Sequence, residues 1–402
     1  MVINRVGPPV RGNDLYGRDA FVNLLWSKLG RGNILLAAPR RFGKTSVMYK
    51  LIDDPKSDFK IIHADLEHLS EPADLIVELM VKLTSDNRMA QLIEGLAAKT
   101  SEALHGIRTA TDELSAFNFK IKLKDEIRPN WQESGKQLFK KLESAGQPVL
   151  FILDEFPMMI DRMARLDGKR DEARYLLRWL RALRESPELH TVRFLIAGSI
   201  GIGTVLNQLG EISAINDFEQ LRLGPFTPEV ADSFLVELAK TDHLDLSDEC
   251  RKTVVDLVGV PVPFFLQILY SEIAKATQLD GMPLLPQAIE KLYRDKVLGV
   301  DCKTYFDHYY GRLRDYYQPA EEKALKRLLR EMARVPGLSQ DNCFAIYRDA
   351  IGEEADQEVF VGTLSNLEND FYIRFDHESN QYQFACKILR DWWLRHYGME
   401  TI

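Results

Sequence analysis

Residues 38–46 read Ala-Pro-Arg-Arg-Phe-Gly-Lys-Thr-Ser and lie between an apolar run, 34–37, and a segment with helical spacing. A loop between a buried strand and a helix aims consecutive backbone N–H groups at one point, where the helix N-terminus adds partial positive charge. This pattern predicts a phosphate-binding loop (P-loop). A chance Gly-Lys-Thr at a helix start is the alternative, and the strand before and the helix after argue against it.

The residue types in the P-loop suit a nucleoside triphosphate. Gly43 allows the backbone to approach closely, Lys44 reaches the β- and γ-phosphates, and the Thr45 hydroxyl ligates the accompanying magnesium ion. Ala38 stands where such loops usually carry their first glycine, and alanine adopts many of the turns needed there. We expect ATP or ADP with Mg²⁺ as cofactors. The candidate nucleotide-binding residues of the loop are Arg40, Arg41, Phe42, Gly43, Lys44, Thr45 and Ser46.

A second apolar run, 148–155, reads Pro-Val-Leu-Phe-Ile-Leu-Asp-Glu and ends on two carboxylates. Parallel α/β sheets bind ligands at the carboxyl ends of their strands. We expect Asp154 to hold the magnesium ion, through water, because magnesium keeps much of its hydration shell. Glu155 would then polarise the attacking water, as a general base or by orienting it. A strand ending at an ordinary polar turn is the alternative, but the P-loop and the acidic strand together favour a nucleoside-triphosphate site more than either does alone.

A third apolar run, 191–197, ends at Gly198 and Ser199. In a strand beside the acidic one, Ser199 would sense the nucleotide state; a plain turn serine is equally compatible. The preceding segment, 170–186, is a predicted helix with a basic face. That face is either solvated or donates an arginine to a neighbouring subunit's γ-phosphate. Its arginines are Arg174, Arg178, Arg181 and Arg184.

Length and composition describe a globular protein of two or three domains. The chain has 402 residues, of which 45% are hydrophobic and 28% charged, with a formal net charge of -8. This charge argues against a protein that coats nucleic acid. The four cysteines are widely spaced and predict neither a zinc site nor disulfides. The N-terminus lacks a signal pattern and no run approaches a membrane span, so we expect a cytoplasmic location without membrane partners.

Three motifs together resemble P-loop ATPases of the AAA+ and STAND kind, especially the archaeal-ATPase family. The lead-in 15–18, Leu-Tyr-Gly-Arg, resembles their motif beside the adenine. The Arg-Arg pair before Gly-Lys-Thr-Ser resembles their P-loop, and 259–261, Gly-Val-Pro, resembles the Gly-x-Pro motif of their helical lid. The resemblance implies that Gly17, Arg18 and Pro261 lie near the adenosine. Phe21 departs from the acid often found after the lead-in, and Pro261 also suits a helix start.

The predicted fold class is α/β, with a P-loop NTPase core of parallel strands flanked by helices, a helical lid and a C-terminal winged helix. The predicted domains are 1–226 for the core, 227–300 for the lid and 301–402 for the winged helix. An insertion at about 100–130 interrupts the core. Within it, alternating apolar residues at 117–123 predict a short strand. In the lid, Thr227 and Ser247 are candidate N-caps, and Pro286 falls near a helix start.

The winged helix is predicted from helices near 320–335, 340–350 and 357–368, followed by two short strands, 371–375 and 381–384. Residues 301–402 carry 13 Lys and Arg against 18 Asp and Glu, a net charge of -5. The expected recognition helix, 357–368, has no basic residue, which removes the electrostatic attraction that dominates DNA binding. Protein docking or autoinhibition is therefore favoured over DNA recognition. The counter-evidence is a basic cluster, Lys323, Lys326, Arg327, Arg330 and Arg334.

Three hypotheses about function follow from these patterns. The first is an ATP-hydrolysing molecular switch that couples nucleotide state to a protein partner on another chain or to nucleotide-dependent self-assembly. The second is a DNA-acting ATPase of replication, transposition or repair that uses the winged helix. The third is a nucleotide-binding module that rarely hydrolyses. Lys44 and Glu155 are the expected catalytic residues of the first two.

Overall fold

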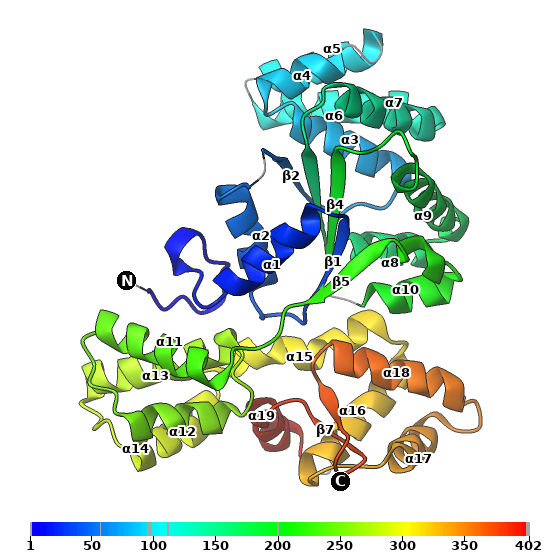
Figure 1. The fold of residues 1–402 in the computed structure, drawn as a ribbon. Coiled ribbons are helices and arrows are strands. Elements are labelled where there is room, and N and C mark those ends of the chain that lie inside the picture. The colour runs from blue at the N-terminus through cyan, green and yellow to red at the C-terminus, as the bar shows by residue number, and fades with distance from the viewer. Residues whose placement is uncertain (1, 57, 95–97, 111, 199–200, 399–402) are drawn as a thin grey trace. The chain divides into compact units, whose positions relative to one another are not determined.

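The computed structural model describes residues 1–402 except 1, 57, 95–97, 111, 199–200 and 399–402 (Figure 1). The pattern of contacts divides the chain into two compact units. The α/β unit comprises residues 19–38 and 47–223. The lid–wing unit comprises residues 1–18, 39–46 and 224–402, so it includes the P-loop. The boundaries of the three predicted domains stay a prediction.

Five parallel strands form the sheet of the α/β unit, in the order β2-β3-β4-β1-β5. They are β1 (Asn33–Ala37), β2 (Lys60–Asp65), β3 (Val149–Asp154), β4 (Val192–Gly198) and β5 (Phe218–Arg222). The apolar runs of β1, β3 and β4 are buried, as expected for strands covered on both faces. This sheet confirms the predicted parallel α/β core.

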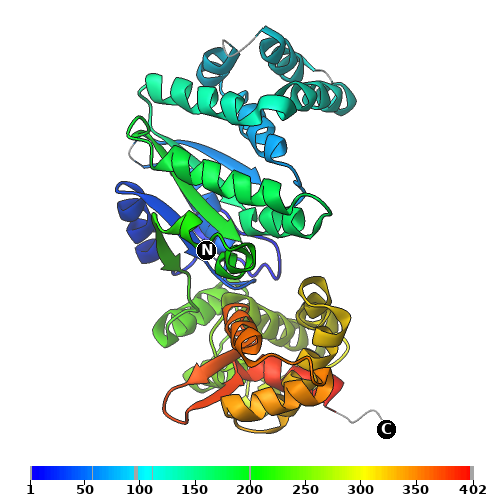
Figure 2. The same cartoon turned by 90° about the vertical axis from the view of Figure 1, so that its right-hand side faces the viewer.

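Helices cover both faces of the sheet (Figures 1 and 2). One face carries α1 (Asp19–Leu29) and α2 (Lys44–Asp53), and the other carries α8 (Phe156–Arg165) and α9 (Arg170–Arg184). Phe151 of β3 belongs to the core cluster with residues of α8 and α9. The remaining α-helices in the described part of the unit are α3 (Pro72–Leu83), α4 (Asn87–Glu94), α5 (Ala98–Thr109), α6 (Glu113–Ile127), α7 (Trp131–Ser144) and α10 (Ile202–Leu209).

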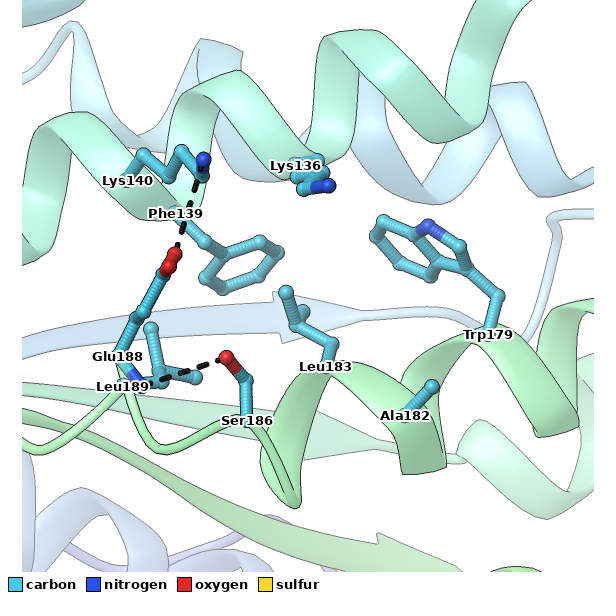
Figure 3. Close-up of a pocket in the computed structure, with 9 residues that line it drawn as sticks. All are labelled: Lys136, Phe139, Lys140, Trp179, Ala182, Leu183, Ser186, Glu188 and Leu189. Carbon is cyan, nitrogen blue, oxygen red and sulfur yellow. Dashed lines mark hydrogen bonds and ion pairs between the residues drawn. The ribbon is translucent and has the colours of Figure 1, made fainter.

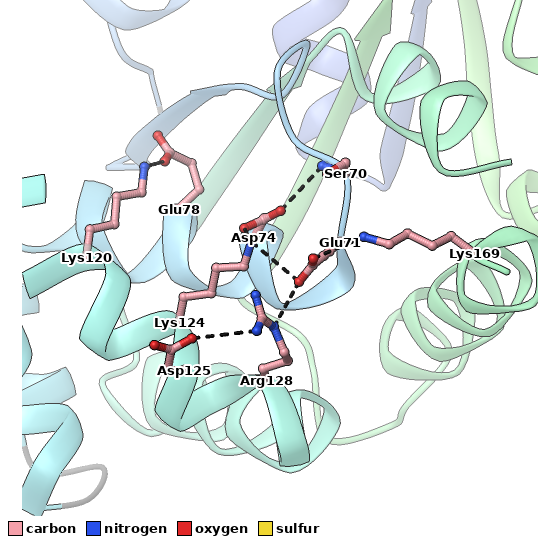
Figure 4. Close-up of polar contacts among 9 residues, drawn as sticks. All are labelled: Ser70, Glu71, Asp74, Glu78, Lys120, Lys124, Asp125, Arg128 and Lys169. Carbon is pink, nitrogen blue, oxygen red and sulfur yellow. Dashed lines mark hydrogen bonds and ion pairs between the residues drawn. The ribbon is translucent and has the colours of Figure 1, made fainter. Parts of the chain in front are cut away.

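The strand predicted at 117–123 is wrong, because these residues lie within helix α6. The alternating apolar residues do not share one buried face, because Phe117 and Ile121 are 59% and 43% exposed whereas Leu123 is buried. Lysines four residues apart explain the helix, since Lys120 pairs with Glu78 at 2.6 Å and Lys124 pairs with Asp74 at 2.6 Å (Figure 4). Those two carboxylates are also four residues apart, on α3, so two helices match their charges along facing sides.

Glu71, directly before α3, collects three cations in the same region (Figure 4). Lys169 and Arg128 each lie 3.0 Å from its carboxylate, and Lys124 lies at 3.4 Å. Burial alone would raise the pKa of Glu71, but these cations lower it below its usual value. The network ties α6 and the segment before α9 to the start of α3.

The first part of the lid–wing unit beyond residue 224 is all-helical. It contains α11 (Pro228–Thr241), α12 (Asp248–Val258), α13 (Pro263–Asp280) and α14 (Pro286–Leu292). The Thr227 and Ser247 side chains accept hydrogen bonds from the N–H groups of Val230 and Cys250, which confirms both predicted caps. Pro286 opens α14, as predicted. Pro261 does not begin a helix, because α13 starts at Pro263.

The C-terminal part has the predicted winged-helix architecture. Its elements are α15 (Lys303–Tyr316), α16 (Pro319–Arg334), α17 (Gln340–Ile351), α18 (Gln357–Asn369), β6 (Ile373–Asp376), β7 (Gln381–Phe384) and α19 (Lys387–Tyr397). The antiparallel β6–β7 hairpin follows α18 (Figure 2) and pairs further through Leu338 with Tyr382. Trp392 and Trp393 of α19 are fully buried, so this apolar segment packs in the core as expected.

Candidate functional site

The P-loop backbone has the shape expected of a phosphate cradle. Arg41 and Gly43 both have positive φ angles, 71° and 93°, and α2 begins at Lys44. Alternation between right- and left-handed backbone directs neighbouring N–H groups to one side, where the helix N-terminus adds partial charge. Glycine adopts this conformation freely, whereas Arg41 needs support from its surroundings. The Ser46 hydroxyl accepts a hydrogen bond from the Val10 N–H at 3.0 Å.

The lead-in motif is joined to the P-loop through Arg18. Its guanidinium donates to the carbonyl oxygens of Phe42 at 3.2 Å and Gly224 at 2.9 Å. The same group lies over the Phe226 ring, 4.7 Å from its centroid. Burial lowers the pKa of Arg18 to about 10, which leaves it charged at neutral pH. Arg18 therefore fixes the backbone of the P-loop.

Gly17 and Pro261 lie against the same Phe226. A side chain at Gly17 would meet Val230 of α11 and the Phe226 ring. The Pro261 carbonyl accepts a hydrogen bond from the Phe226 N–H at 3.0 Å. The structure thus brings Gly17, Arg18 and Pro261 together around one residue, Phe226, although Pro261 is far from the other two in sequence. Their role beside the adenosine stays a prediction.

Two side chains of the P-loop pack on the lid and the winged helix. The Arg41 guanidinium lies 4.5 Å from the ring centroid of Phe264 on α13, and it donates to the Gly7 carbonyl at 3.1 Å. The Phe42 ring is buried and meets the Phe371 ring edge-on, with centroids 4.9 Å apart. Phe371 lies between α18 and β6, and it has a left-handed φ of 65°. These contacts hold Arg41 in its unusual conformation.

A buried ionic cluster lies next to Phe371 in the chain. Arg312 of α15 pairs with Asp370 at 3.3 Å, and their side chains are 4% and 14% exposed. Burial alone would lower the pKa of Arg312, but the adjacent carboxylate raises it. His308 lies one helical turn before Arg312, and both of its ring nitrogens are buried. Burial and then the charges of Arg41, Arg40 and Arg312 lower its pKa to about 3.

The acidic pair ends β3 in the α/β unit. Asp154 is buried, and its carboxylate accepts a hydrogen bond from the Glu155 N–H at 3.0 Å. Glu155 precedes α8 in a left-handed conformation, with φ of 54°. Such conformations cost free energy in residues other than glycine and gather at functional sites. Strands β3, β4 and β1 are neighbours in that order and run parallel. Asp154, at the end of β3, therefore lies at the same carboxyl end of the sheet as the end of β1.

The basic face of α9 is used within the α/β unit. Arg174 donates to the Leu209 carbonyl at 2.8 Å, and Arg178 pairs with Glu211. Arg184 forms a two-point ion pair with Asp217 at 2.8 and 2.9 Å. Arg181 pairs with Glu185, which directly follows the same helix. These contacts tie α9 to the segment that leads into β5 and support a structural role for the face.

Magnesium fits the donors that the chain offers. In the described part of the chain, no group of three or more His, Cys, Asp and Glu side chains could hold a metal on its own. A hydroxyl at Thr45 and one carboxylate at Asp154 suit Mg²⁺, which takes its other ligands from water and phosphate oxygens. Ser199, the predicted sensor, lies outside the described residues. None of the described helices combines the length and apolarity needed to cross a bilayer.

The sequence did not point to Arg312, Asp370 or Phe371 as site residues. They lie far from any motif, and proximity to the P-loop appears only after folding. One signal was present: α15 buries Phe306, Tyr309 and Leu313, and Arg312 falls on the same face. A charged residue on the apolar face of a helix is rarely buried without a partner.

Solved structures with a similar fold support the architecture described above. No family model matches the chain, and no curated protein matches its sequence. Among solved structures, a Walker-type ATPase of Pyrococcus abyssi aligns with a TM-score of 0.63 at 16% identity, covering 97% of this chain and 99% of that one. The ORC2 protein of Aeropyrum pernix aligns with a TM-score of 0.52 at 12% identity, covering 98% and 94%. The chain therefore has the P-loop NTPase fold, with a C-terminal winged helix.

Proposed function

We propose that this protein is an ATP-binding and ATP-hydrolysing switch of the AAA+ and STAND kind, related to the archaeal-ATPase family. Nucleotide state at the P-loop would control contacts of the lid and the winged helix, and through them a protein partner on a separate chain or self-assembly. One observation carries the proposal: Phe42, within the phosphate-binding loop, packs on Phe371 of the winged helix. A loop that only bound phosphate would not need this contact.

Most of the predicted site residues have a role in this proposal. The N–H groups at 41–44 and the Lys44 ammonium neutralise the phosphates, while Gly17, Arg18 and Pro261 border the adenosine. Thr45 and Asp154 hold Mg²⁺, which when bound stabilises the charge of phosphoryl transfer. Glu155 orients the attacking water or accepts its proton, and Ser199 reports the γ-phosphate. The left-handed backbone of Glu155 supports a functional role for that residue.

The switch depends on a difference in contacts between nucleotide states. A ligand shifts a conformational equilibrium only by its differential affinity for the two forms. The P-loop side chains supply such a difference, because a change in the backbone at 41–42 moves Arg41 relative to Phe264 and Phe42 relative to Phe371. Similarity in fold to a protein described as a Walker-type ATPase supports the nucleotide.

The test is the release of a fluorescent ADP derivative from Phe371→Ala. An edge-on aromatic pair contributes about 0.5–1.5 kcal/mol beyond its buried area, so we expect release to be about two- to tenfold faster. The matched control is Phe375→Ala, whose ring contacts Tyr382 and His377 within the hairpin. Native release from Phe371→Ala would contradict the coupling. Native affinity in Lys44→Ala would contradict the nucleotide site itself.

A DNA-acting ATPase of replication, transposition or repair is the second candidate, and the winged-helix fold is the observation that favours it. The basic cluster of α16 offers little support, since Lys326 pairs with Glu322 and Arg327 with Asp349. Exposed residues of α18 are neutral or acidic. The discriminating measurement is hydrolysis with and without duplex DNA at several salt concentrations. Stimulation that disappears at high salt would favour this candidate over the protein-coupled switch.

A further inference from the structure

A pocket lies in the α/β unit, between α7, α9 and the loop that leads into β4 (Figure 3). Its volume is about 280 Å³. The loop reaches the amino end of β4. The P-loop, in contrast, follows the carboxyl end of β1, which runs parallel to β4. The pocket therefore lies at the amino end of the parallel strands, opposite their carboxyl end. Its lining residues are Lys136, Phe139, Lys140, Trp179, Ala182, Leu183, Ser186, Glu188 and Leu189.

The aromatic wall of this pocket is fixed by its neighbours. The Trp179 indole meets the Trp131 ring edge-on at 5.1 Å between centroids and lies 6.4 Å from the Phe139 ring. Gly135 of α7 makes room for it, because a Cβ there would come within 2.6 Å of the indole. Figure 3 shows the Phe139 and Trp179 side chains on opposite sides of Leu183. A wall built before binding reduces the ordering cost of taking up a flat ring.

The rim of the pocket carries more positive than negative charge. Lys140 lies 3.6 Å from Glu188, and both side chains are exposed. In the described part of the chain, Lys136 has no carboxylate within 4.0 Å. One ammonium group at the mouth is thus available to an anion. Apolar walls with a few polar groups at one end are the usual construction of a small-molecule site.

We propose that this pocket binds a small aromatic carboxylate, with its ring between Trp179 and Leu183 and its carboxylate at Lys136. The volume is just below the range of about 300–1,000 Å³ typical of ligand pockets, which suits one or two fused rings. It is too small for a nucleotide with its sugar and phosphates. The flat walls favour a ring over a branched aliphatic chain, because aromatic groups stack or meet edge-on.

The probe is 2-naphthoate, titrated into the full chain by calorimetry, with neutral 2-naphthamide as its comparison. We expect the acid to bind at one site and the amide about two- to fivefold more weakly, the range for an exposed ion pair. Lys136→Met should weaken the acid by the same factor and leave the amide unchanged. The matched control is Lys141→Met, on the same helix but outside the lining residues.

A second variant tests the location. Ala182 is exposed and lines the pocket, so Ala182→Phe fills the space without disturbing the core and should abolish binding of both probes. Lys44→Ala should bind 2-naphthoate like the native chain. Equal affinity for acid and amide, or full binding to Ala182→Phe, would overturn the proposal. So would loss of binding in Lys44→Ala, since that result would place the anion at the P-loop.

Discussion

Arg312 and Asp370 form an ion pair at 3.3 Å inside the lid–wing unit, where the guanidinium is 4% exposed. Arg312 comes from α15, and Asp370 follows α18, next to the Phe371 that packs on the P-loop. A buried pair holds its two elements in one arrangement, because either charge alone would be left without water or a partner.

Removing one member of this pair should destabilise the unit severely. Arg312→Met leaves a buried carboxylate without its counter-charge, and we expect a loss of about 3–5 kcal/mol in the free energy of unfolding by urea. The control is Arg327→Met, which breaks the exposed pair with Asp349 and should cost at most about 1 kcal/mol. Equal losses in the two variants would contradict the burial argument.

His308 should make stability depend on pH in mildly acidic solution. Its pKa falls from the usual 6.5 to about 3 in the folded protein, first through burial and then through Arg41, Arg40 and Arg312. Between pH 6.5 and 3, the unfolded chain is protonated at this histidine and the folded chain is not, which favours unfolding. The contribution of His308 to folding stability is therefore complete above pH 6.5 and is lost as pH falls toward 3. Urea unfolding at several pH values should show a shallower decline in His308→Leu. An unchanged slope would contradict the assignment.

Gly135 should not tolerate a methyl group, although it lies in a helix. Alanine normally stabilises an exposed helix position by about 0.5–1 kcal/mol relative to glycine. At Gly135, the new Cβ would lie 2.6 Å from Trp179 and 2.9 Å from Ile76, so we expect Gly135→Ala to lose about 1–3 kcal/mol. Gly362→Ala in α18 meets nothing within 4 Å and should gain stability. Thermal unfolding of both variants measures the contrast.

Glu155→Gln should separate nucleotide binding from hydrolysis. The amide preserves shape and cannot accept a proton, so single-turnover ATP cleavage should fall by about 10²–10⁴-fold while ATP affinity stays near native. Asp161→Asn on α8, which pairs with Arg165, is the matched control and should cleave ATP normally. Unchanged cleavage in Glu155→Gln would remove that residue from the mechanism. It would then favour a module that rarely hydrolyses.

The sheet was readable from sequence where burial is complete. Strands β3 and β4 are nearly continuous apolar runs, broken only by Asp154 at the end of β3 and Arg193 in β4, as expected for strands covered on both faces. Strand β5, Phe218–Arg222, was not predicted, because an edge strand with Glu219, Gln220 and Arg222 has no such run. The helix α6 was misread, since its ion pairs with α3 depend on residues more than 40 positions away.

The sequence predicted those parts of the candidate site whose chemistry requires particular residues at adjacent positions. A P-loop needs glycine, lysine and threonine at adjacent positions, so residues 43–45 announce it. The packing of Phe42 on Phe371 has no local requirement, because any two apolar residues brought together by folding can do the same. Tertiary contacts of this kind leave no spacing to detect.

The placement of Phe42 has a thermodynamic consequence for whatever the winged helix binds. If nucleotide changes how firmly Phe371 is held, then a protein that grips the region around Phe371 must change nucleotide affinity by the same factor, because linkage between two sites is mutual. A partner would thus retain or expel ADP without approaching the phosphates. A molecule that binds the β6–β7 hairpin and Phe371 would thereby control how much nucleotide is bound at the P-loop.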